Sequence, residues 1–315
     1  MDKGTLHRWS RPDTILVATT LQDAPHLVPH AIAQARQSDG KVLLAHVIEP
    51  VNLETSQAEG PCVLPSPTVR SVQAELNRVV KQFQQEGVLC EPFTLKGVPQ
   101  KEIVALIRQR GADRVIVGTS SADAMDRILL GSVAEDLLHQ VDIPVCVIGP
   151  RVRPQIHPDH KPSSILFATS FRHKSQQGAQ FALEIANLYQ ARLTLLHVMP
   201  FESVGTQEYF RLQAWRKEEL LDLINKETKL WSSPSIAIRG GDAATEILAE
   251  AAKISADLIV LGTAAASKAA RLLRTGVVHR VIAKTKAPVM TLRRERNMSR
   301  VHSILQPWQN IEAPA

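Results

Sequence analysis

The residues with the clearest chemical potential lie between positions 118 and 132. Gly118 ends an apolar run, Ser121 follows after two further residues, and Gly131 and Ser132 follow after nine more. Glycine lets backbone N–H groups approach an anion, and a helix that begins at Gly131 and Ser132 would add unpaired donors and the positive end of its dipole. Arg127 would add a charged donor. The spacing therefore predicts a phosphate site.

A second loop with related chemistry occurs later in the chain. It carries more positive charge, and the residues that could meet an anion there are Gly262, Lys268, Arg271, Arg274, Gly276, His279 and Arg280. His279 and Arg280 would stand in the first turn of the next helix, where a cation opposes the helix dipole unless an anion is bound. This loop is a second, weaker candidate for an anion site.

Structural explanations compete with both interpretations. Ser132 with Glu135 three residues later matches a capping box, which any helix can use without a ligand. The basic residues of the second loop match a solvated surface better than a phosphate site. His46 and His197 could be general bases, but both lie in similar apolar strands, which favours a framework role for them.

Other catalytic patterns are missing from the sequence. It has no Walker phosphate loop, no nucleophile elbow, no HExxH and no His and Cys spacing that would hold a metal. Glu102 and Glu246 fall in the first turns of predicted helices, where the dipole alone explains an acidic residue. Cys146 lies in the run PVCVIG and is expected to be a small buried apolar residue rather than a reactive thiol.

An internal repeat organises these residues. TILVATT at 14–20 returns as SILFATS at 164–170, and ADRVIVGTS at 112–120 returns as ADLIVLGTA at 256–264. The repeat predicts copy one at residues 1–150, a linker at 151–162, copy two at 163–293 and a basic, flexible tail at 294–315. At a constant offset of 144, Gly131 aligns with Thr275 and Ser132 with Gly276.

Each copy alternates short runs of Val, Ile and Leu with longer segments of helical period. This order predicts an α/β fold with two tandem doubly wound domains, each a five-stranded parallel sheet with helices on both faces. The strands are expected at residues 14–19, 41–48, 91–96, 114–118, 144–148, 164–169, 192–198, 234–239, 257–262 and 288–292. A helix is expected over about residues 24–37, with Val28, Ile32 and Ala35 facing the core.

Such a sheet binds ligands beyond the carboxyl ends of its strands. The residues expected there are Thr20, Val47 and Gly118 in copy one and Ser170, Val198 and Gly262 in copy two.

Composition narrows the class of protein. The 315 residues are 44% hydrophobic and 22% charged, which is typical of a globular protein, and the net charge of +6 is a mild preference for anions. Aromatic residues are only 4%, which disfavours binding of nucleic acid by stacking. No apolar run reaches the roughly 18 residues of a membrane helix. Three scattered cysteines and the lack of a signal peptide indicate the cytoplasm.

The motifs together resemble the universal stress protein family. The residues that carry the resemblance are Gly118 to Ser132, VPQKEIV at 98–104, the LLAHV strand and the closing PVCVIG, and the repeat resembles a tandem two-domain member. ATP-binding members carry Gly, two residues, Gly, nine residues, Gly and then Ser or Thr. They also carry an Asp after the first strand and a Val after the second. The resemblance implies an adenine nucleotide alpha hydrolase-like fold.

This chain departs from the family pattern at named positions. Ser121 stands for the second Gly, and Thr20 and Ser170 stand where the Asp is expected, while Val47 fits. The resemblance implies a sensor that binds ATP or a related nucleotide, with magnesium, through copy one, and catalyses at most slow ATP hydrolysis. The alternative is an interaction module without nucleotide. Pairing of the fifth strands would join the copies as an intramolecular pseudo-dimer, and a homodimer stays open. RRERNMSR at 293–300 could meet another partner.

Overall fold

The computed structural model describes residues 3–49, 69–119, 130–153, 156–171, 175–200, 207–224, 230–263 and 276–293. Copy one alternates strands with helices along the chain. Its elements are α1 (Lys3–Ser10), β1 (Thr14–Ala18), α2 (Ala24–Ser38), β2 (Lys41–Ile48), α3 (Val69–Gln85), β3 (Cys90–Lys96), α4 (Pro99–Arg110), β4 (Arg114–Gly118), α5 (Ser132–Gln140) and β5 (Val145–Ile148).

Copy two repeats this order from its first strand onward. Its elements are β6 (Ser164–Thr169), α6 (Ser175–Tyr189), β7 (Arg192–Met199), α7 (Gln207–Asp222), β8 (Ser235–Gly240), α8 (Ala243–Lys253), β9 (Leu258–Thr263), α10 (Val277–Lys284) and β10 (Val289–Arg293). The ten strands lie within one residue of the predicted bounds. The helix expected at residues 24–37 is α2, which buries Val28, Ile32 and Ala35 as predicted.

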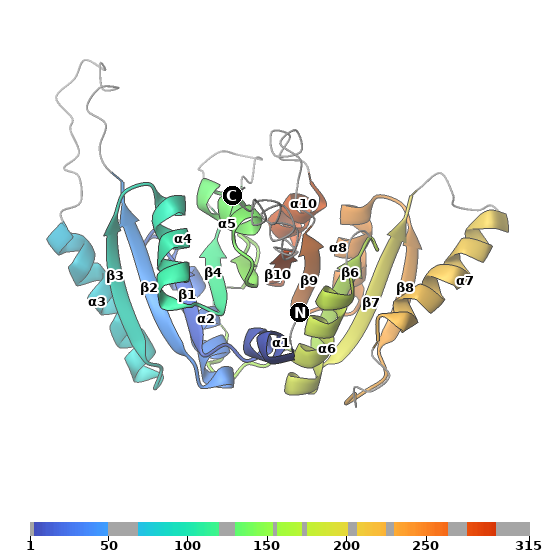
Figure 1. Ribbon diagram of the computed structural model, residues 1–315, viewed down its shortest axis with the longest axis horizontal. Coiled ribbons are helices and arrows are strands. Elements are labelled where there is room, and N and C mark those ends of the chain that lie inside the picture. The colour runs from blue at the N-terminus through green and yellow to red at the C-terminus, as the bar shows by residue number, and fades with distance from the viewer. Residues whose placement is uncertain are drawn as a thin grey trace, which may run out of the picture.

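One sheet runs through both copies (Figure 1). Its ten strands follow the order β3-β2-β1-β4-β5-β10-β9-β6-β7-β8. All neighbours are parallel except β5 and β10, which pair antiparallel with Met290 opposite Cys146. The predicted fold class and the predicted pairing of the fifth strands are therefore confirmed.

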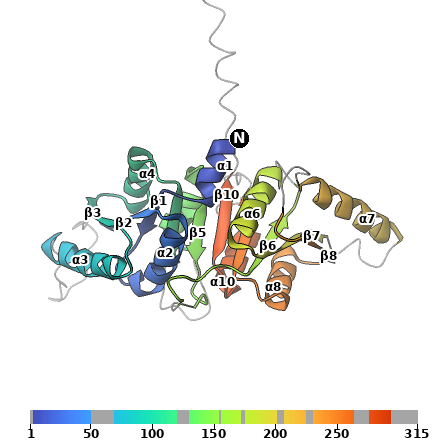
Figure 2. The same cartoon turned by 90° about the horizontal axis from the view of Figure 1, so that it is seen from below.

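Helices cover both faces of each half of the sheet (Figure 2). Alternate strand residues face opposite layers, so Ile15 and Val17 pack with α2 and α3 while Leu16 and Ala18 pack with α4 and α5. This burial on both faces explains why the strands are continuous apolar runs. Cys146 is fully buried in β5, as expected of a small apolar residue, and burial raises the pKa of its thiol.

The first helix joins the two copies. α1 packs against α6, and Trp9 on it is only 5% exposed. Ser10 donates a hydrogen bond to Glu184 of α6 at 2.9 Å, while Arg8 pairs with Asp113 of copy one at 2.5 Å. The N-terminal segment therefore holds copy two against the end of copy one, a role that its composition did not indicate.

The segment after β5 is fastened to α2. Nε2 of His26 donates to the carbonyl of Gly149 at 2.9 Å, and Nε2 of His30 donates to that of Arg153 at 2.8 Å. Gln37, further along the same helix, donates to the carbonyl of His160. Three side chains of one helix thus hold the backbone between the copies, so the described parts of the linker, residues 151–153 and 156–162, belong to the folded structure.

Acidification should weaken this attachment through His30. Burial lowers the pKa of His30 from its ordinary 6.5 to about 4, helped by His26 and His160 and opposed by the hydrogen bond to Arg153. Between these two pKa values, His30 binds more protons in the unfolded chain than in the folded protein. The free energy of unfolding should therefore fall as the pH drops, by up to about 1.4 kcal/mol per pH unit.

Urea unfolding of the wild type and of His30→Gln at pH 7 and pH 5 measures this contribution. The variant should lose less stability between the two pH values, whereas His157→Gln, at an exposed position, should behave as the wild type. An equal loss in the wild type and His30→Gln would show that His30 is not responsible.

Candidate functional site

In copy one the carboxyl ends of β1, β2 and β4 lie side by side, where the sequence predicts the ligand crevice. Ala18 lies opposite Ala45 of β2 and Val117 of β4. Gly118 is therefore one step beyond this level, and Thr20 and Val47 are two steps beyond it. β1 lies between β2 and β4, so the winding direction reverses between β1 and β4, where an open α/β sheet binds ligands.

Asp23 supplies a carboxylate to this crevice. Its Oδ1 accepts hydrogen bonds from Oγ1 of Thr19 at 2.6 Å and from N of Thr20 at 2.9 Å. Its Oδ2 lies 2.9 Å from the position that a Cβ on Gly118 would take. The sequence reasoning missed Asp23 because it considered only position 20. The available signal was an acidic residue directly before α2, within reach of the end of β1.

The helix that follows the glycine motif begins at Gly131. Gly131 is the N-cap of α5, with φ −59° and ψ 153°, and no side chain caps it. Ser132 is the first helical residue, so the predicted capping box with Glu135 is wrong. The reason is a shift of one position: in a capping box Ser must stand outside the helix, where its oxygen can reach the third N–H. The structural alternative for Ser132 therefore loses its support.

The matching helix of copy two also begins after a glycine, but it lacks the serine that follows this glycine in copy one. Gly276 is the N-cap of α10, with φ −62° and ψ 154°, nearly the conformation of Gly131. By backbone conformation Gly276 therefore matches Gly131, and the alignment of Gly131 with Thr275 and of Ser132 with Gly276 is wrong. The helix is one residue shorter in copy two, which a constant offset could not reveal. Val277 takes the place of Ser132, and copy two has no hydroxyl there.

Arg280 in α10 is paired internally. Its Nη1 and Nη2 donate to the two carboxylate oxygens of Asp242 at 2.8 and 2.6 Å. These hydrogen bonds, with further ones from Thr245, hold the pKa of Asp242 well below its ordinary value. Asp242, the N-cap of α8, therefore already supplies a negative charge to Arg280, which does not need an external anion for this purpose.

The turns after β1 and β6 share one backbone conformation but differ in side chain. Leu21 and Phe171 both have positive φ, at 72° and 57°. In copy two the Phe171 ring lies 4.6 Å from that of His197, and the guanidinium of Arg216 lies 5.1 Å from it. Beside Ser170, copy two therefore has an aromatic ring and a cation where copy one has Leu21.

The paired histidines are framework residues, as predicted. Nδ1 of His46 donates to the carbonyl of Thr19, and Nδ1 of His197 donates to that of Thr169, both at 2.9 Å. Burial lowers the pKa of His197. Glu102 and Glu246 lie in the first turns of α4 and α8, also as predicted.

Part of the predicted site lies outside the described residues. This part comprises Ser121, Arg127, Lys268, Arg271, Arg274 and nearly all of the basic segment at 293–300. Of the remaining candidates, the structure brings Thr20, Val47 and Gly118 to neighbouring strand ends in copy one and places Ser170, Val198 and Gly262 at the matching strand ends of copy two. Within the described ranges, no three His, Cys, Asp or Glu side chains gather as a metal site would require. No described helix has the length and apolar character to cross a membrane.

Comparison with known proteins agrees with this architecture. The model of the universal stress protein family matches residues 12–149 and 163–293. The universal stress protein MJ0531 of Methanocaldococcus jannaschii is 34% identical over 120 residues, which cover 38% of this chain and 71% of that protein.

Solved structures share the tandem arrangement. A universal stress protein from Archaeoglobus fulgidus is 18% identical and aligns over 91% of this chain and 98% of its own, with a TM-score of 0.65. A protein of unknown function, PA1789 from Pseudomonas aeruginosa, is 17% identical and aligns over 94% and 98%, with a TM-score of 0.63. At these identities the likeness concerns the fold.

Proposed function

The chain belongs to the universal stress protein family, and from this premise we propose that it is a stress-response sensor or regulator that binds an adenine nucleotide such as ATP in copy one. The observation that carries the proposal is the group of residues at the carboxyl ends of β1 and β4. Gly118 lies there beside the carboxylate of Asp23, and the helix that follows β4 in the chain begins with a glycine N-cap at Gly131. We propose that the protein performs no catalysis beyond slow hydrolysis of the nucleotide.

The phosphates would bind at the start of α5. Ser132 is exposed at its first position, and Gly131 is an N-cap without a side-chain partner. Backbone N–H groups and the helix dipole favour an anion at such a terminus. Magnesium would arrive with the nucleotide as its chelate.

Asp23 would replace the carboxylate that position 20 lacks. In the family pattern an Asp after the first strand meets the nucleoside. Thr20 has only a hydroxyl there, but Oδ2 of Asp23 forms no hydrogen bond to the described residues and lies over Gly118. An ionised carboxylate accepts hydrogen bonds from ribose hydroxyls. Val47, half-buried at the end of β2, would contact the adenine.

Copy two would be a structural partner. Val277 replaces the Ser at the start of α10, and Arg280 is already paired with Asp242. Phe171 and Arg216 add bulk beside Ser170. We therefore expect a single nucleotide per chain.

The test is to release and identify any nucleotide that the purified protein carries, and then to titrate Mg–ATP by calorimetry. Gly131→Val should lower the affinity for ATP at least about tenfold, because the valine side chain would cover the helix start. Ser132→Ala should lower the affinity less. Gly276→Val is the matched variant in copy two and should leave the affinity unchanged. If the wild type neither carries nor binds nucleotide at millimolar concentration, the proposal fails.

One observation favours the alternative, an interaction module that works without nucleotide. α7 exposes Phe210 and Trp215, at 64% and 56%, near the outer edge of copy two (Figure 1). Exposed aromatic residues of this size are enriched at protein interfaces. An unliganded protein that still binds a partner, and loses it on Phe210→Ser with Trp215→Ser, would favour this function.

A further inference from the structure

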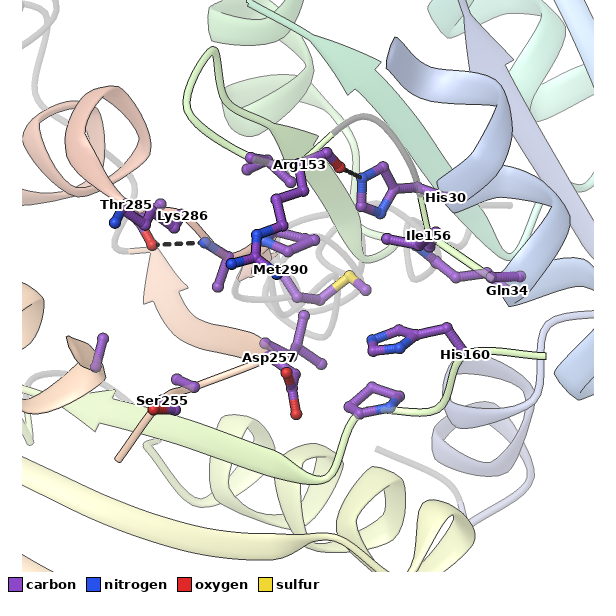
Figure 3. A pocket seen from close by; sticks show the side chains of 18 of the residues that line it. His30, Gln34, Arg153, Ile156, His160, Ser255, Asp257, Thr285, Lys286 and Met290 are labelled. Carbon is purple, nitrogen blue, oxygen red and sulfur yellow. Dashed lines mark hydrogen bonds between the residues drawn. The ribbon is translucent and has the colours of Figure 1, made fainter. Parts of the chain in front are cut away.

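A cavity lies between the two copies and shares no residue with the proposed nucleotide site. It measures about 820 Å³ and is bounded by α2 and the linker of copy one, and by the ends of α6, α8 and α10 of copy two. Figure 3 shows Arg153, His160 and Asp257 approaching the same space from separate segments. A cavity of this volume accommodates a small organic molecule.

The charged groups that line this cavity are mostly cations. Arg153, Lys284 and Lys286 form no ion pair with any carboxylate in the part of the chain that the structure describes. The one carboxylate in the lining, that of Asp257, accepts hydrogen bonds from Ser163 and Ser164. The positive charge of the cavity is therefore not neutralised by its own walls.

A buried guanidinium adds to this imbalance. Arg114 lines the cavity and is only 2% exposed. It donates to Oε1 of Gln34 at 2.9 Å and to the carbonyl of Trp9 at 2.5 Å, both uncharged acceptors. Its Nε has no hydrogen-bond partner in the described structure. A buried cation with a free donor and no carboxylate beside it is costly unless an anion completes the site.

Part of the remaining wall is apolar. Val152, Ile185, Leu258 and Met290 line the cavity and are buried, and Ile156 is half-buried beside them. Such walls favour a ligand with an apolar body, because contact between them releases water from the ligand and from the wall.

We propose that this cavity binds an organic anion that combines an apolar body with a phosphate or carboxylate group. The apolar body would lie against Ile156 and Met290, and the anionic group would meet Arg153 and Lys286, with the buried charge of Arg114 adding to the positive potential of the cavity. The ligand would contact both copies and the linker at once, so its binding would stabilise their junction. This site is independent of the proposed function, since none of its residues belongs to the nucleotide crevice.

The fluorescent probe 8-anilinonaphthalene-1-sulfonate has this chemistry and serves as the test ligand. The wild type should bind one molecule of the probe. The double variant Arg153→Gln with Lys286→Gln should bind the probe at least about tenfold more weakly. Lys81→Gln with Lys101→Gln is the matched control, because both lysines are exposed and remote from the cavity, and should change nothing. Ala252→Trp places a ring at the exposed edge of the cavity and should also lower the affinity for the probe.

Competition identifies the anionic group. 1-Naphthyl phosphate or 1-naphthoate should displace the probe at concentrations at least about tenfold below those of neutral 1-naphthol, and the stronger of the two names the preferred anion. Gly131→Val should retain the probe, which separates this site from the nucleotide crevice. The proposal is overturned if the wild type binds no probe, if the cavity and control variants behave alike, or if 1-naphthol competes as well as the anions.

Discussion

Replacing Gly149 with alanine should lower the free energy of unfolding by about 2–3 kcal/mol. Gly149 follows β5, and a Cβ on it would overlap the carbonyl oxygen of Ile282 in α10. That oxygen belongs to the backbone of copy two and cannot rotate away. His26 holds the carbonyl of Gly149 on α2, so the residue is fixed by both copies. The added methyl group must therefore displace one copy from the other.

Urea unfolding gives the measurement, and Gly262→Ala gives the control. Gly262 lies in β9, and a Cβ there meets nothing within 4 Å. Alanine at an open site costs little and restricts the unfolded chain, so this control should be close to neutral. Equal midpoints for the two variants would mean that the close contact between Gly149 and Ile282 does not form.

The pattern of apolar residues in the sequence was sufficient to predict the strands of the sheet. Apolar runs such as 41–48 are long, uniform and repeated, so the strands and their parallel arrangement could be predicted within one residue. The pairing of β5 with β10 was implied by the family resemblance, whereas its antiparallel direction was not predicted. The strand bounds depend on local composition, which a single sequence records directly.

Contacts between distant segments could not be predicted in this way. His26 and His30 lie one helical turn apart on α2, but each meets a carbonyl 123 residues away. α1 is short, and its packing on α6 depends on a neighbour about 170 residues later. Neither partner can be identified from the spacing on one side of the contact.

The candidate site was predicted in part for the same reason. Strand ends placed Thr20, Val47 and Gly118 correctly, because topology alone brings them together. Asp23 reaches the crevice only through the turn after Thr19, which its hydrogen bonds define. The pairing of Arg280 with Asp242 joins two helix starts, so it could not be identified from the spacing of the basic first turn alone.

Replacing Gly118 with alanine should lower the affinity for ATP at least about tenfold. A Cβ at this position would lie 2.9 Å from Oδ2 of Asp23 and 3.4 Å from Cδ2 of Leu27. The carboxylate must then leave the crevice, and the backbone can no longer approach a ligand as closely. Gly262→Ala, the equivalent change in copy two, meets open space and should keep the affinity of the wild type.

The most direct measurement is the calorimetric titration of Mg–ATP into the wild type, Gly118→Ala and Gly262→Ala, with both variants shown to be folded. We predict one site per chain in the wild type and in Gly262→Ala, and a loss of affinity in Gly118→Ala. No binding to the wild type, or a loss confined to Gly262→Ala, would contradict the assignment of copy one as the nucleotide-binding copy.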